Sequence, residues 1–200
     1  MTVTQKESLF HWNYFIALEH DLIECSRYVE FSRKNIHTYS IEFAHLLFAS
    51  SSEVDVILKK MCKIIAPNQN VSSIHSYRQI VLIRFPQLRN EQVNVDRFGI
   101  NFKPWLKWQP DSSPLWWQNY NKVKHQRDEY FYKADLNSVL RSMGALLIVS
   151  VYYYYLDALN KNNQVESPTL NLRDITRTLN PGSELLTLNK AYYYHTLIVD

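Results

Sequence analysis

The sequence predicts a mainly α-helical protein with a small β element. Only three of its 200 residues are glycine, which argues against a glycine-rich phosphate loop and against the many tight turns of a doubly wound sheet. Hydrophobic residues make up 46% of the chain and charged residues 20%, as is typical of one globular domain with a sizeable core. In several stretches the hydrophobic residues recur at a spacing of three and four, which predicts amphipathic helices.

Three helices are predicted in the first half of the chain. The first covers residues 12–31, and the second covers residues 40–65. Residues 50–53, Ser-Ser-Ser-Glu, have the form of a capping box and could begin a new helix, but we favour one long helix because small side chains would let a neighbouring helix approach closely. The third covers residues 74–85 and ends there, since the residue before Pro86 resists the helical conformation.

The middle of the chain changes in character. Val93 and Val95 alternate with polar residues, and so do Phe98, Ile100 and Phe102, with a shift of parity beside Gly99. This pattern predicts a small pair of strands or one bulged strand. Residues 103–114 form a loop rich in tryptophan and proline, and Pro114 suits the first turn of the helix that follows.

The second half contains the most apolar helix. No proline or glycine lies between Leu115 and Met143, so one very long helix is possible. The alternative is a break near residues 128–133, after which a core helix covers residues 136–159. We expect residues 1–164 to form a helical bundle and residues 165–200 a C-terminal β-hairpin-like appendage, which either pairs with the middle strands or docks on a partner protein.

Composition excludes several classes of function. Lysine and arginine exceed the acids by 22 to 19, a net charge of +3, which is too small to indicate a nucleic-acid protein by itself. Cys25 and Cys62 lie in helix-like patterns and have no partner at metal spacing, so we expect buried free thiols in a reducing cytoplasm. Residues 1–7 lack the apolar run of a signal peptide, and the longest apolar run, residues 143–156, is shorter than the ~20 residues that cross a membrane. We expect a soluble cytoplasmic protein with no membrane partner.

Known catalytic signatures are missing from the chain. The seven histidines include no His-x-x-x-His pair, and no paired cysteines accompany them. There is neither a nucleophile elbow nor a Walker loop. We therefore expect no metal and no cofactor.

Residues 116–127, Trp-Trp-Gln-Asn-Tyr-Asn-Lys-Val-Lys-His-Gln-Arg, are the strongest candidate for a site. At 3.6 residues per turn, one face of the predicted helix carries Trp117, Asn121, Lys124, His125 and Asp128. Arg127 points in nearly the opposite direction. In a continuous helix this polar face would run into the apolar seam formed by Leu136, Val139, Met143 and Leu147. It would then lie at the end of a hydrophobic seam, inside the bundle, where helical bundles keep their sites.

The chemistry of these residues suits phosphate. Histidine can move protons in a phosphodiester transfer, while lysine and asparagine can hold the phosphoryl oxygens as negative charge develops. The alternative is that His125 is a hydrogen-bonded core residue and that Lys122, Lys124 and Arg127 belong to a solvated turn. The four tryptophans of this region could stack bases or fill the core; they are Trp105, Trp108, Trp116 and Trp117.

Three segments in this order resemble a divergent bacterial branch of the HEPN superfamily (higher eukaryotes and prokaryotes nucleotide-binding). They are residues 51–62, the Pro-Trp-Leu-Lys-Trp loop at 104–108 and the motif at 116–127. The resemblance covers about residues 14–159, and its most specific piece is Tyr-Asn-Lys-Val-Lys-His at 120–125. It implies an up-and-down helical bundle, homodimers that bring two motif helices together, and metal-independent RNA cleavage in toxin or phage-defence systems.

One position departs from the pattern of that superfamily. Its active members carry an arginine a few positions ahead of the histidine, where it clamps phosphate. The corresponding positions here are Gln118, Asn119 and Tyr120. Only His125 transfers directly, with Asn121 and Lys122 or Lys124 as substitutes for the arginine.

We therefore expect a protein that binds or cleaves RNA or a nucleotide, with His125 as general acid/base. Glu53 on the second helix would orient His125 across the bundle. The remaining candidate site residues would hold phosphate or nucleic acid: Asn121, Lys122, Lys124, Arg127 and Trp117. The alternatives are a non-catalytic interaction or regulatory module, with the tyrosine-rich C-terminal segment as its docking surface, and a small-molecule binder at the tryptophan loop.

Overall fold

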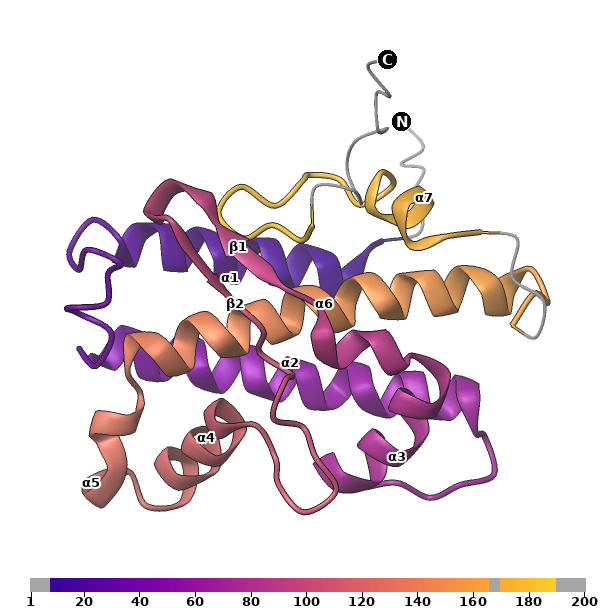
Figure 1. The fold of residues 1–200 in the computed structure, drawn as a ribbon, viewed down its shortest axis with the longest axis horizontal. Coiled ribbons are helices and arrows are strands. Elements are labelled where there is room, and N and C mark those ends of the chain that lie inside the picture. Colours follow the sequence, from indigo (N-terminus) through magenta and orange to yellow (C-terminus); the bar gives the residue numbers. More distant parts are fainter. Residues whose placement is uncertain (1–7, 166–169, 190–200) are drawn as a thin grey trace, which may run out of the picture.

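Three long helices lie alongside one another in the computed structural model, which describes residues 8–165 and 170–189 (Figure 1). They are α1 (Phe10–Cys25), α2 (Ile41–Ile65) and α6 (Leu136–Lys161). A backbone bridge joins Tyr39 to Asp135, just before α2 and α6 begin, and these two helices run in the same direction, with α1 opposed (Figure 1). The prediction of a mainly helical chain with a small β element is confirmed.

Helix α2 is one continuous helix, as predicted. The side chain of Ser40 accepts a hydrogen bond from the backbone N–H of Phe43 and so caps its first turn. Ser50 is fully buried, and its Oγ lies 2.8 Å from Oγ of Ser142 on α6. The small side chain therefore lets α6 approach α2 closely, which is the reason for its place in mid-helix.

Helix α6 is the centre of the core. Asp135 caps it by accepting a hydrogen bond from the backbone N–H of Ser138. The helix is long and apolar enough to cross a membrane by length and composition alone, but 83% of its most apolar window is buried by the rest of the chain. Mostly buried apolar helices of this kind also occur at the core of water-soluble bundles.

The middle of the chain folds as predicted. Strands β1 (Val93–Val95) and β2 (Ile100–Phe102) pair antiparallel, with Val93 opposite Phe102. Gly99 has φ +62°, a left-handed conformation that glycine adopts without steric cost. The strands pack on α6 at Gly144, where a Cβ would lie 2.7 Å from the Phe102 ring.

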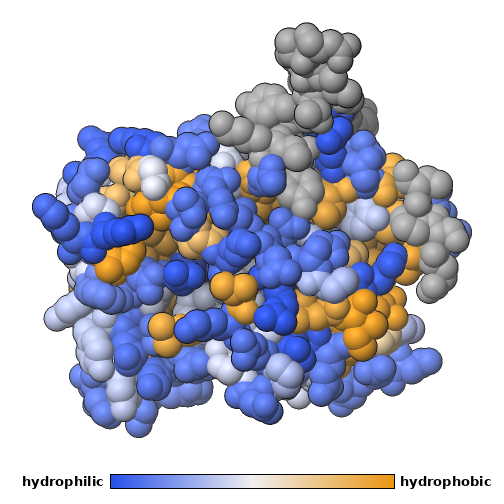
Figure 2. Space-filling view, in the orientation of Figure 1, coloured by the Kyte–Doolittle hydropathy of each residue, from blue (hydrophilic) through white to orange (hydrophobic). Residues whose placement is uncertain are grey.

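The shorter helices surround this body. Helix α3 (Ile74–Arg84) begins with a capping box and stops before Pro86, as predicted. Short 3-10 helices lie in the segments that connect these elements in the described chain: η1 (Pro86–Asn90), η2 (Asp96–Phe98) and η3 (Phe131–Lys133). On the face drawn in Figure 2 hydrophilic side chains dominate, and the hydrophobic ones gather in separate patches, one of them over α3.

The first helix is shorter than predicted. It ends at Cys25, and turns lead from there to Ser40. The Ser26 hydroxyl donates a hydrogen bond to the Ile23 carbonyl, a local contact that competes with helix continuation. Val29, which completed the predicted apolar stripe, packs only partly against the core.

The C-terminal segment shares the core of the bundle. It contains a short helix that the sequence pattern did not predict, α7 (Leu172–Thr176). Thr187 exchanges two backbone hydrogen bonds with Asn94 of β1, so the segment pairs with the middle strands. Its buried side chains belong to the same hydrophobic cluster as the long helices: Ile175, Leu179, Leu185, Leu186 and Leu188. The second strand of the predicted hairpin, residues 191–199, lies outside the described residues.

Candidate functional site

The motif helix ends at its histidine. Helix α4 covers Leu115–His125, and Gln126 leaves the helical conformation at φ −144° and ψ 56°. A separate short helix, α5 (Arg127–Tyr130), follows, and the core helix begins at Leu136. The helix is therefore interrupted, and the interruption begins at Gln126, two residues before the predicted interval of residues 128–133.

Because of this break, the polar face of the motif does not run into the apolar seam of α6. Helix α4 buries Trp116, Trp117, Asn119, Tyr120 and Val123. Asn121 is half-buried, and Lys122, Lys124, His125 and Arg127 are exposed. The cluster thus lies at a solvated end of the bundle, and the expectation of an interior position is wrong. The alternative of a hydrogen-bonded core histidine is wrong too.

The exposed end of α4 carries unpaired charge. Lys124 Nζ lies 5.4 Å from the Tyr120 ring centroid, and Lys122 Nζ lies 5.3 Å from that of Tyr130, distances at which a ring face attracts a cation. Within residues 8–165 and 170–189 no carboxylate forms an ion pair with either lysine or with Arg127, and His125 makes no hydrogen bond. Asp128 and Glu129 follow directly in the chain.

A cavity of about 670 Å³ opens beside this end of α4. Arg127, Asp128 and Phe131 line it from the α5 side, and Ile41, Ala44 and His45 line it from the start of α2. Its volume lies within the range of roughly 300–1,000 Å³ that small-molecule sites occupy. The helix break brings Arg127 to this cavity.

The tryptophans fill the interior. Trp105, Trp108 and Trp116 are fully buried, and the Trp105 ring contacts those of Trp108 and Trp116 at centroid distances of 4.5 and 5.3 Å. Trp116 Nε1 donates to the Pro104 carbonyl and so holds the loop before α4. Trp117, the predicted nucleic-acid contact, is only 8% exposed and offers little surface to a base.

Glu53 has another partner than His125. Its carboxylate bonds to Nδ1 of His11, and both side chains are buried. Ala44 lines the cavity beside the motif, and Glu53 lies nine residues further along α2, about 14 Å away at 1.5 Å per residue. The structure therefore separates Glu53 from the motif, against the predicted orienting role. No sequence signal links His11 to Glu53, because 42 positions separate them.

The surroundings of this buried pair are aromatic. The Tyr154 hydroxyl accepts hydrogen bonds from the backbone N–H groups of His11 and Trp12, at 3.1 and 3.3 Å. Burial raises the pKa of Tyr154. Tyr153 meets the His11 ring edge-on at 5.2 Å. His11 and Glu53 are buried, and Tyr153 and Tyr154 are half-buried. Because the contacts join residues of three helices, the cluster fastens α1 to α2 and α6.

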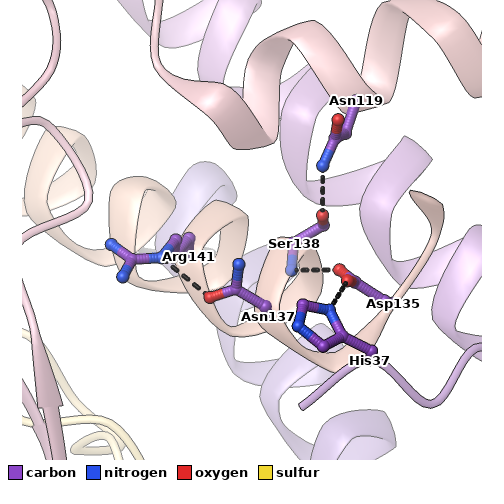
Figure 3. Close-up of polar contacts among 6 residues, drawn as sticks. All are labelled: His37, Asn119, Asp135, Asn137, Ser138 and Arg141. Carbon is purple, nitrogen blue, oxygen red and sulfur yellow. Dashed lines mark hydrogen bonds and ion pairs between the residues drawn. The ribbon is translucent and has the colours of Figure 1, made fainter.

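A second polar network joins α4 to α6 (Figure 3). Asn119 donates a hydrogen bond to Ser138 Oγ at 2.9 Å. Asp135 accepts from the Ser138 backbone and lies 3.0 Å from Nδ1 of His37, whose side chain is 82% exposed. A carboxylate that holds one nitrogen of an exposed imidazole is an arrangement found in general bases. Sequence reasoning missed His37; the only available signal was Asp135 with Ser138 three residues later, which is typical of a helix cap.

Metal and thiol chemistry find no support in the described part of the chain. No group of three histidine, cysteine, aspartate or glutamate side chains there could hold a metal ion. Burial raises the pKa of the Cys62 thiol to about 12, and burial together with nearby acids raises that of Cys25. Thiols with raised pKa are poor nucleophiles at neutral pH.

Comparisons with known proteins found no relative: no protein-family model, no curated protein and no solved structure matches this chain. The function is therefore inferred from the residues themselves.

Proposed function

We propose that the protein binds RNA at the exposed end of α4 and cleaves it without a metal ion, with His125 as general acid/base. One observation carries this proposal: an exposed imidazole without a hydrogen-bond partner among the described residues lies next to the exposed cations Lys122, Lys124 and Arg127. Cations on a surface attract the RNA backbone, and a solvent-accessible histidine can reach a phosphodiester there.

The reaction would be an internal transfer. The ribose 2′-oxygen forms a bond to phosphorus, and the bond from phosphorus to the 5′-oxygen breaks. A base takes the 2′-hydroxyl proton and an acid protonates the leaving 5′-oxygen. The products are a 2′,3′-cyclic phosphate and a 5′-hydroxyl. The two lysines and Arg127 would stabilise the charge on the non-bridging oxygens, in place of the arginine that the resembled superfamily carries.

The proposed site includes a second copy of the chain. One histidine cannot act as base and acid in the same step, and the resembled superfamily brings two motif helices together in a homodimer. Large apolar side chains are exposed at this end of the bundle: Tyr39 at 50%, Ile41 at 63% and Tyr132 at 52%. Ile41 lines the same cavity as Arg127, and Tyr39 contacts the ring of Phe131, which lines it too. Burial of these side chains would favour dimerisation through this end. By the same resemblance, the setting would be toxin or phage-defence activity in the cytoplasm.

The test compares three proteins on a mixed RNA pool in EDTA: wild type, His125→Ala and His37→Ala. We expect the wild type to leave 5′-hydroxyl and 2′,3′-cyclic phosphate ends, His125→Ala to be at least about 100-fold slower because general acid–base catalysis contributes that much, and His37→Ala to match the wild type. Light scattering of the same preparations reports the subunit number.

Three outcomes contradict the proposal. Full activity of a folded His125→Ala protein would exclude this histidine from the mechanism, and loss of activity only in His37→Ala would move the reaction to the His37–Asp135 pair. Cleavage by a monomer would exclude a two-subunit site. If the wild type leaves RNA intact, the non-catalytic interaction module becomes the favoured function.

A further inference from the structure

A second, smaller cavity lies at the other end of α4. Its volume is about 220 Å³, and it is enclosed by the loop before α4, the first residues of α4 and the first turns of α6. Ten residues separate Leu115, which lines it, from His125, about 15 Å along the helix. The cavity is therefore distinct from the proposed RNA site.

The charged side chains that line this cavity are all cationic, and the other lining residues are neutral. Lys103, Lys107 and Arg141 line it, and no carboxylate does. Arg141 is half-buried, and burial lowers the pKa of its guanidinium. Among the described residues no acid forms an ion pair with it. A half-buried arginine without a carboxylate is costly unless an anion from outside compensates it.

Neighbouring groups hold the guanidinium in place. Its Nε donates a hydrogen bond to Asn137 Oδ1 at 2.9 Å, one turn away on α6 (Figure 3). Its Cζ lies 5.6 Å from the centroid of the Phe102 ring. These two contacts leave the terminal nitrogens of the guanidinium for a ligand, and an arginine fork suits phosphate oxygens well.

The start of α4 adds positive potential. The helix begins at Leu115 after Pro114, with no side-chain cap and no acid in its first turn. In the described chain the backbone N–H groups of Leu115 and Trp116 have no acceptor. Free N–H groups and the helix dipole both favour an anion at this end.

From these contacts we infer that the cavity binds a phosphate or diphosphate group. Three cations, one of them a positioned guanidinium, and free helix N–H groups converge on one small space without an acid. Its volume lies below the roughly 300–1,000 Å³ of pockets that enclose a whole drug-sized ligand, so it takes the phosphate moiety and leaves the rest of the molecule outside. The group comes either from a free nucleotide or from the phosphorylated end of an RNA.

The test is calorimetric titration with diphosphate, without divalent metal and at constant ionic strength. We expect saturable binding to the wild type, and an affinity at least about tenfold lower for Arg141→Gln and Lys107→Ala, because each variant loses a hydrogen bond to a charged group. Lys63→Ala, an exposed lysine at the far end of α2, removes the same charge elsewhere and should bind like the wild type. Lys107 is preferred to Lys103, because Lys103 also lines a neighbouring cavity with Glu91 and Asp96.

Two further pairs of titrations identify the source of the phosphate. ADP is compared with adenosine, and a 5′-phosphorylated oligonucleotide with its 5′-hydroxyl form; preference for the phosphorylated member of either pair supports the inference and names the source. Binding that is equal in Arg141→Gln, Lys107→Ala and the wild type would overturn it, as would the absence of diphosphate binding. His125→Ala should bind diphosphate normally, so failure of the RNA proposal leaves this one standing.

Discussion

Glu53 shows how one side chain can be misassigned from its place in the sequence. An acid in the middle of an amphipathic helix, across from a motif histidine, suits an orienting role. In the fold its carboxylate is buried and bonds to His11. The Tyr154 hydroxyl accepts a hydrogen bond from the His11 backbone N–H beside it. The residue that pairs with it comes from the first turn of the first helix, and so Glu53 ties α1 to α2.

Replacing Glu53 should therefore change stability rather than catalysis. We expect Glu53→Ala to lower the free energy of unfolding by about 3 kcal/mol, because removal of one partner of a buried pair leaves the other without compensation. Denaturant unfolding measures this. The matched control is Glu24→Ala, an exposed acid of α1, which should change the free energy by less than about 0.5 kcal/mol.

The opposite result would restore the catalytic role. If Glu53→Ala unfolds like the wild type but cleaves RNA far more slowly, Glu53 acts on the reaction and the pairing with His11 is not its main function. Glu53→Gln, which keeps a hydrogen-bonding side chain, should retain most of the stability.

At the scale of elements, two contacts with α6 shape the candidate sites. The break after His125 separates α4 from α6, and the bond from Asn119 to Ser138 then joins them side by side. On its other side α6 holds the strand pair through Gly144, whose lack of a side chain makes room for Phe102. The Phe102 ring in turn lies beneath the Arg141 guanidinium.

Gly144→Ala should separate the strand pair from α6. The new Cβ would lie 2.7 Å from Phe102 and 3.1 Å from Val93, and displacement of these buried side chains costs about 1–3 kcal/mol, which outweighs the gain in helix propensity of roughly 1 kcal/mol at most. Thermal or denaturant unfolding measures the difference.

Gly182→Ala is the control for this experiment, since no atom lies within 4 Å of a Cβ at that position. It should leave the stability within about 0.5 kcal/mol of the wild type. A Gly144→Ala protein that is more stable than the wild type would mean that the strands move aside without cost.

For the whole molecule, one buried acid joins the two ends of the described chain. Glu19 on α1 is fully buried and accepts backbone hydrogen bonds from Glu184, Leu185 and Leu186, at 2.9, 3.1 and 2.9 Å. The Ser183 hydroxyl donates to it as well. Trp12 Nε1 adds a bond to the Pro181 carbonyl at 2.7 Å. The C-terminal segment is therefore an integral part of the bundle up to residue 188.

Glu19→Ala should release this segment. Three backbone N–H groups would lose a charged acceptor, each such bond being worth about 1.5–3 kcal/mol, so we expect amide hydrogen exchange at Leu185 and Leu186 to become at least about tenfold faster. Asp21→Ala removes an exposed acid from the same helix and should leave exchange unchanged. Equal protection in both variants would show that apolar packing alone holds the segment.

Much of the fold could be predicted because its signals are local. The spacing of apolar residues located α2, α3 and α6, Pro86 marked the end of α3, and alternation around Gly99 located the strand pair. Each of these follows from the geometry of a few neighbouring residues. For the candidate site, the sequence identified the motif at 116–127 but placed it inside the bundle, because without a proline or glycine the break at Gln126 leaves no local mark.

The sequence by itself determined the helical class, the positions of the main elements and the residue types available for phosphate chemistry, because periodicity and composition act over short distances along the chain. Only the tertiary structure decided that His125 is exposed, that Glu53 pairs with His11, and that Lys103, Lys107 and Arg141 meet in one cavity. His11 is far from Glu53 in sequence, and Arg141 is far from the two lysines, so their contacts depend on how whole helices pack. Burial and long-range pairing are properties of that packing, so no short stretch of the chain encodes them.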